Sequence, residues 1–381
     1  MIDKFHIVEE CFPLQKIPER FQISPFLVFF LIHAAQFGVG VLGYQRIIAM
    51  SAGHDAWMAI LIIGIYIHFI IWLIYSLLEK SGGGDIVQAH QFAFGKWIGN
   101  FLSFLFILYF VVTSITVVRT YIEIIQVWLF PDIETWFFVS LFLLLVYYIV
   151  SGGLRVVTGI AFLGVILPSY LILTFVLPGE YLEFRNLLPI YDTTVKDLLL
   201  SAKDMSLTVI GFEALLVYYP YLKDLNKSKK WAHLSIFTTN TIYLFIAIIT
   251  FAYFSDKMLE KQIWATLTIW KIIELPFVER VEYIGIANWC LIILPNICIF
   301  VWAGSRVAKR VFNVKHRLTL IITLLFIFGL SLLFEDRKNI HILNDYVGKV
   351  GFYLVFAYIP FLFLVVSFAK WRKEKKRNVS S

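Results

Sequence analysis

The chain has 381 residues, of which 60% are hydrophobic and 15% are charged, and its mean hydropathy is +0.80. Soluble domains are closer to half apolar and a quarter charged, so this composition excludes an ordinary soluble protein and predicts an integral membrane protein. The formal net charge of +7 does not indicate nucleic-acid binding, because the basic residues gather in connecting segments and at the C-terminus.

Ten segments are apolar enough to predict membrane-spanning helices, since a helix needs about 20 apolar residues to cross a bilayer. If the N-terminus is cytoplasmic, the inner connections carry about three times as many Lys and Arg residues as the outer ones, which predicts that both termini are cytoplasmic. A cytoplasmic segment 1–22, a membrane domain 23–370 and a basic cytoplasmic tail 371–381 follow. The predicted spans are 23–50, 55–79, 97–127, 135–151, 156–178, 199–221, 231–254, 280–306, 317–334 and 347–370.

The first and sixth of these spans are interrupted by glycine, at Gly38 and Gly40 in the first and at Gly211 in the sixth. Glycine weakens a helix, and lipid cannot satisfy the backbone groups that an interruption exposes. Two interrupted helices at corresponding places in two halves are typical of a substrate site near the bilayer midplane. Ten spans also divide into five plus five, which predicts inverted repeats over 23–178 and 199–370.

Polar side chains within the spans are the other candidates for the site. Glu213 follows Gly211 and Phe212, and a carboxylate at this depth marks a functional site or holds the unwound turn through backbone N–H groups. Tyr109 and Thr113 give the third span a polar stripe that either lines a cavity or bonds a neighbouring helix.

Two further features concern the outer side of the predicted bundle. Arg119 and Glu123 are four residues apart near the outer end of the third span, which favours an intrahelical ion pair over a gate. The amphipathic connection 255–280 is expected to lie on the outer membrane surface.

The helix ends at the two breaks indicate the chemistry of the ligand. Such ends offer N–H groups to an anion and C=O groups to a cation, which suits the zwitterion of an amino acid. An uncharged sugar or nucleoside could use the same groups. The His and Cys positions lack zinc-ligand spacing and no catalytic motif is visible, so we expect no enzyme activity, no metal and no cofactor.

Three short sequences resemble the spore permease family, which comprises the B subunits of GerA-type germinant receptors and is related to the amino acid–polyamine–organocation transporters. They are Ala52-Gly53-His54-Asp55-Ala56-Trp57, Gly211-Phe212-Glu213, and the run 275–284, which contains Pro-Phe-Val-Glu-Arg-Val-Glu-Tyr. The resemblance extends from about residue 20 to 370.

The resemblance implies a leucine-transporter-like fold in the inner membrane of a spore, with a nutrient-sensing pocket and partner A and C subunits. It implies that Gly38, Gly40, Gly211 and Glu213 line the pocket. It also implies an ion-pair cluster of Glu279, Arg280 and Glu282 with a structural role or a role in coupling to partners.

Two alternatives use the same fold. One is a proton- or sodium-coupled amino acid transporter, and the other is a subunit that conducts ions or water. The body of the fifth span contains no lysine to substitute for a coupling sodium, which disfavours one form of transport.

Overall fold

The computed structural model describes residues 17–273 and 280–380 and is built almost entirely of helices. Six helical segments of this part are long and apolar enough to cross a membrane. They confirm an all-α, multi-pass membrane protein. These segments are Tyr44–Lys80, Ile86–Trp128, Leu154–Tyr181, Leu225–Tyr253, Val281–Phe312 and Arg337–Lys375, and three shorter apolar helices accompany them: Leu27–Gln36, Thr135–Ser151 and His316–Ser331.

The first half of the chain begins with a helix that is broken where the glycines predict it. The first predicted span is divided into α2, a 3-10 turn η2 and α3. The elements are η1 Glu19–Phe21, α2 Leu27–Gln36, η2 Val39–Leu42, α3 Tyr44–Ala52, η3 Gly53–Asp55, α4 Ala56–Lys80, α5 Ile86–Trp128, α6 Thr135–Ser151, α7 Leu154–Ile166, η4 Leu167–Tyr181 and η5 Phe184–Leu187.

The second half also begins with a broken helix, which is divided into short pieces from α8 to η7. The elements are α8 Val195–Asp204, α9 Ser206–Val209, η6 Phe212–Ala214, α10 Leu215–Tyr218, η7 Tyr219–Tyr221, α11 Leu225–Tyr253, α12 Asp256–Leu259, α13 Ala265–Ile272, α14 Val281–Phe312, α15 His316–Ser331, α16 Arg337–Tyr353, the π-helix η8 Leu354–Tyr358 and α17 Ile359–Ser380.

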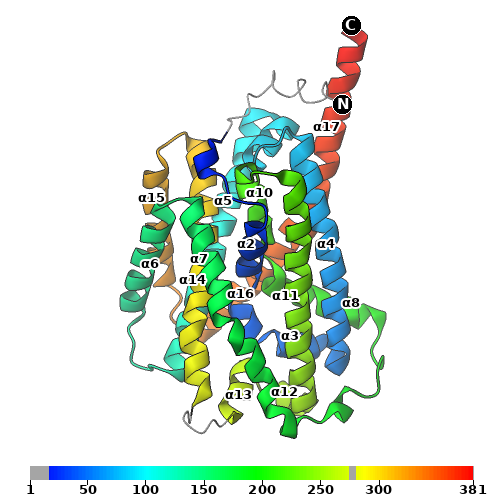
Figure 1. Ribbon diagram of the computed structural model, residues 1–381, viewed down its shortest axis with the longest axis vertical. Coiled ribbons are helices and arrows are strands. Elements are labelled where there is room, and N and C mark those ends of the chain that lie inside the picture. Colours follow the sequence, from blue (N-terminus) through cyan, green and yellow to red (C-terminus); the bar gives the residue numbers. More distant parts are fainter. Residues whose placement is uncertain (1–16, 274–279, 381) are drawn as a thin grey trace.

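The broken helix α2 lies in the interior of the bundle, packed against α7, α11 and α14, while α14 runs along α5 (Figure 1). Its buried face includes Leu31 and Ile32. Before the start of α2, Ile23 pairs in a parallel bridge with Leu222, so the two broken helices are tied together at the ends that lie away from the breaks. The end of α17 lies at one end of the bundle, and α12 and α13 lie at the other.

Within the connection 255–280, which was expected on the outer membrane surface, helix α13 packs into the protein instead. Helix α13 buries Leu267, Ile269 and Trp270, and the Trp270 indole N–H donates to the hydroxyl of Thr174 at 2.8 Å. The apolar positions that suggest a surface helix therefore face α14 and η4. A membrane surface and a protein interior both select one apolar helical face, so the pattern does not separate the two environments.

Candidate functional site

The first break leaves backbone carbonyls that side chains from distant helices satisfy. Helix α2 ends at Gln36, and Gly38 is extended with φ −128° and ψ −145°. The Trp289 indole N–H lies 3.3 Å from the Gly38 carbonyl oxygen, and the Thr266 hydroxyl donates to the carbonyl of Val41 at 2.9 Å. This irregular backbone is thus held by protein groups rather than exposed to lipid.

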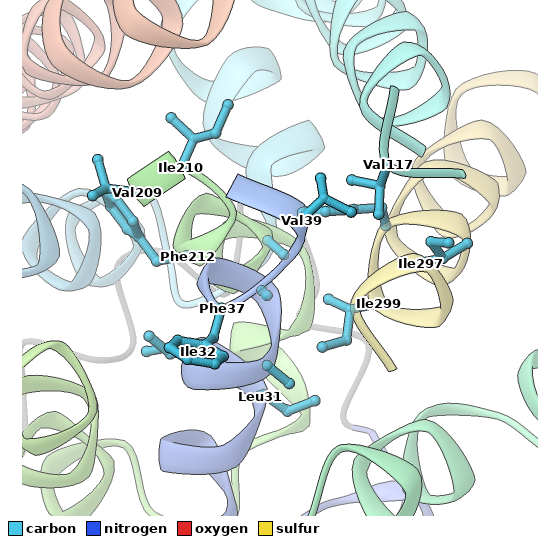
Figure 2. Packing of buried hydrophobic residues seen from close by; sticks show 14 of the residues in the cluster. Leu31, Ile32, Phe37, Val39, Val117, Val209, Ile210, Phe212, Ile297 and Ile299 are labelled. Atoms are coloured by element: carbon cyan, nitrogen blue, oxygen red, sulfur yellow. The ribbon is translucent and has the colours of Figure 1, made fainter. Parts of the chain in front are cut away.

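The second break requires glycine at its centre. Gly211 has φ +121°, in the region that favours glycine, and a Cβ atom there would overlap the carbonyl oxygen of Ala35. The Gln36 amide donates to the carbonyl of Val209 at 2.6 Å. The two breaks therefore pack against each other through η2 and α9, and Figure 2 labels Val39 at the first break and Ile210 at the second.

Glu213 is fully buried and bonded on both carboxylate oxygens. Its Oε2 accepts the N–H of Gly211 at 2.6 Å, and its Oε1 accepts the hydroxyl of Tyr109 at 2.6 Å. The carboxylate closes the turn that Gly211 opens and ties it to α5. Of the two roles considered from the sequence, this geometry corresponds to holding the unwound turn.

A cavity of ≈ 620 Å³ lies against the first break and is lined in part by charged residues. Small-molecule sites are typically about 300–1,000 Å³, so its size suits a nutrient. The walls come from α2, η2, α3, α5, α9, α14, α16 and the segment before α13. Polar and aromatic residues of the wall are Gln36, Thr113, Thr116, Thr120, Thr208, Trp264, Asn296, Phe300 and Asn344.

The residues expected at the site divide into two groups. Gly38, Gly40 and Thr113 line the cavity. Gly211, Phe212, Glu213 and Tyr109 are buried behind it, where they hold the second break, and they do not belong to the cavity wall.

Gln36, Trp264 and Asn296 line the cavity and were not singled out from the sequence. Within the described residues, Gln36 Oε1, Asn296 Oδ1 and the Trp264 indole N–H are buried without a hydrogen-bond partner. Buried polar groups are normally bonded, so these three are candidates for contact with a ligand. An asparagine beside Pro295 in an otherwise apolar helix is the signal that could have identified Asn296.

Charged side chains of α5 and α16 line part of the cavity. Glu123 pairs with Arg337, at 3.5 Å between Oε1 and Nε, instead of with Arg119. The Arg119 guanidinium donates to the Thr135 hydroxyl at 3.1 Å and lies 3.5 Å from the carbonyl oxygen of Glu335. The expected intrahelical pair is therefore wrong, because partners on neighbouring elements outcompete the one on the same helix.

Two of the three residues in the expected ion-pair cluster are described. Arg280 Nε lies 2.8 Å from Glu282 Oε1, and the Arg280 guanidinium stacks on the ring of Tyr283 at 3.9 Å. Glu282 is buried, at 1% exposure, at the start of α14. Glu279 lies outside the described residues.

Solved structures of similar shape define the class of protein. The fold matches a nucleobase-cation-symport-1 family transporter, Mhp1, with a TM-score of 0.57 and 12% identity over 88% of this chain and 78% of that one. It matches a Na+-coupled sialic acid symporter with a TM-score of 0.57 and 10% identity over 96% and 81%. The protein therefore has a leucine-transporter-like fold.

Sequence comparison then gives the family. Residues 22–340 match the spore permease family, described as spore germination proteins. The chain is 43% identical to the spore germination protein GerQB of Bacillus cereus, over 92% of this chain and 98% of that protein. It is 22% identical to spore germination protein A2 of Bacillus subtilis (strain 168), over 87% and 91%. The chain belongs to the spore permease family.

Proposed function

We propose that this protein is the membrane subunit of a spore germinant receptor and that it binds a small nutrient in the cavity beside the first break. Family membership supports the role in germination. The observation that carries the binding site is the cavity wall itself, in which Gln36, Asn296 and Trp264 present two acceptors and one donor without partners in the described residues. A ligand with both donors and acceptors would satisfy all three.

An amino acid is the ligand class that we propose first. Both signs of charge line the cavity on α5 and α16, where Glu123 and Asp345 accompany Arg337 and Lys338. A zwitterion would find a partner for each of its charged groups there. Partner A and C subunits would then detect the change between ligand-free and ligand-bound arrangements of the bundle.

The proposed topology has ten crossings in two inverted repeats, 23–178 and 199–370, with both termini cytoplasmic. Each of the ten predicted ranges contains helix, and each repeat begins with a broken one. Alkaline phosphatase fused after Ser381 should be inactive, and the same enzyme fused after Ser255, at the α12 end, should be active. The reverse pattern would invert the topology.

The experiment that tests the proposed function begins with deletion of the gene in the sporulating source organism. Dipicolinate release from purified spores is followed across single amino acids, nucleosides and sugars, and amino-acid uptake is measured in growing cells. Loss of one nutrient response with normal uptake would support the receptor. Lost uptake with normal germination would instead support the transporter, which the fold also suits.

A point variant tests the cavity. Trp264→Phe removes the indole N–H but keeps an aromatic ring, so the nutrient concentration for half-maximal release should rise about tenfold, the value of one hydrogen bond. Trp97→Phe is the matched control, because Trp97 is 91% exposed and is not one of the residues that line the cavity. Equal responses of the two variants would remove Trp264 from the site.

A further inference from the structure

The C-terminal end of α2 is a position at which a protein of this fold class can hold a cation. The last four carbonyls of a helix lack partners within it, and the helix dipole places partial negative charge there. In broken transporter helices such ends coordinate sodium or protons. One of the structures with this fold is described as Na+-coupled. The carbonyls at issue are those of Ala34, Ala35 and Gln36.

Each of these three carbonyls has a protein donor. The Asn296 amide nitrogen lies 3.0 Å from the oxygen of Ala34 and 2.7 Å from that of Ala35. The Tyr243 hydroxyl lies 3.0 Å from the oxygen of Gln36. Two carbonyl acceptors on one side of Asn296 require its NH₂ group there, so the orientation of the amide is fixed by its neighbours.

The Asn296 side chain also lies directly against the first break, at the wall of the cavity. A Cβ atom added to Gly38 would approach Asn296 Nδ2 to 3.2 Å, a tight contact. Asn296 and Tyr243 are buried, at 2% and 0% exposure. Among the residues that the structure describes, no group of three His, Cys, Asp or Glu side chains could hold a metal ion. A sodium ion at the end of α2 would need the amide to turn and both of its hydrogen bonds to break.

We infer that Asn296, with Tyr243, takes the place of a coupling cation at the end of α2, so that the bundle closes around its ligand without Na+. The amide supplies two N–H donors and no net charge, which neutralises the carbonyls without an ion. The consequence for nutrient binding rests on the proposed function. The inference that no sodium ion is needed at this position does not depend on the proposed function.

The test measures Na+ directly on the purified full-length protein without any nutrient. Thermal unfolding and ²²Na+ binding are compared in NaCl and in choline chloride at equal ionic strength. The wild type should have the same melting temperature in both salts and no saturable ²²Na+ binding. Saturable binding, or a stabilisation specific to Na+, would overturn the inference.

A second experiment asks whether a substitution at Asn296 creates a Na+ site. Asn296→Asp places a carboxylate oxygen beside the carbonyls of Ala34 and Ala35, and their repulsion should be relieved by Na+, which should then raise the melting temperature saturably. Asn288→Asp is the matched control on the same helix, where the amide bonds only the carbonyl of Ile284, at 2.9 Å. A folded Asn296→Asp protein without a Na+ response would contradict the inference.

Failure of folding or of the proposed function does not obscure the result. If Asn296→Asp does not fold, Asn296→Ala removes both N–H donors to the carbonyls of Ala34 and Ala35 and should gain a Na+ response, and a folded Ala variant without it contradicts the inference. Wild-type spores are then tested with nutrient in Na+-free medium, where their germination response should be the same as in medium with Na+. A protein that neither binds Na+ nor answers any nutrient would fail as a receptor while the inference on Asn296 stands.

Discussion

The two helix breaks differ in how far along the chain their stabilising partners lie. At the first break, the donors to the α2, Gly38 and Val41 carbonyls come from α11, α13 and α14, between 207 and 262 residues away. At the second, Glu213 accepts the N–H of Gly211, two residues before it, and Tyr109 completes the arrangement. The first break lines a cavity and the second is buried. The buried, locally held break therefore packs behind the break that lines the cavity.

The largest expected effect is at the centre of the second break. Gly211→Ala should cost more than about 3 kcal/mol of folding free energy, because it combines a positive φ with overlap on the Ala35 carbonyl. Thermal unfolding in detergent should therefore show little folded protein. Gly329→Ala is the control, since a Cβ there meets nothing within 4 Å. A normal melting temperature for Gly211→Ala would mean that the break does not need this conformation.

The bond between Glu213 and Tyr109 comes next in size. Glu213→Gln should cost about 1.5–3 kcal/mol, since one of the two accepting oxygens is replaced by an NH₂ group that cannot accept a hydrogen bond. Combined with Tyr109→Phe, it should show a coupling of about 0.5–3 kcal/mol. Tyr121→Phe is the matched control in the same helix, because its hydroxyl donates to the Ile286 carbonyl, and its effect should add to that of Glu213→Gln.

Glu213→Gln also distinguishes a structural role of Glu213 from a functional one. If the carboxylate only holds the turn, stability and nutrient response fall together. A lost response with unchanged thermal unfolding would instead make Glu213 a ligand or proton site, and the second break would then be as functional as the first.

A smaller effect is expected where the breaks touch. A Cβ on Gly40 would lie 2.8 Å from the Thr208 hydroxyl oxygen, so Gly40→Ala should cost about 1–3 kcal/mol and weaken the nutrient response. Thr208→Ala removes that oxygen and should restore part of the loss in the double variant. Gly159→Ala, where a Cβ has open space, should behave as wild type. Failure of the rescue would show that Gly40 acts through the cavity and not through α9.

The sequence predicts the second break better than the first for a physical reason. Glycine, a carboxylate and their two-residue spacing are local, so the Gly211-Phe212-Glu213 turn could be located, and so could the helical ranges. Asn296, Tyr243 and Trp264 are recognisable only once α11, α13 and α14 pack around α2. Hydropathy does not report which distant amide meets a given carbonyl. For the same reason the Arg119–Glu123 pair was predicted and Glu123–Arg337 was not.

The smallest effect is expected at the charged residues of the cavity wall, which belong to neither break. Arg337 is about half exposed and its pair with Glu123 is 3.5 Å long, so Arg337→Gln should change the nutrient response by only about 0.2–1 kcal/mol, or less than about fivefold. The shift should shrink further in high salt, because exposed charges are screened. Arg337→Lys keeps the charge and should lie nearer the wild type. Complete loss of the response in Arg337→Gln, with normal thermal unfolding, would make this pair a gate. The functional difference would then lie between the Glu123–Arg337 pair and the breaks rather than between the two breaks.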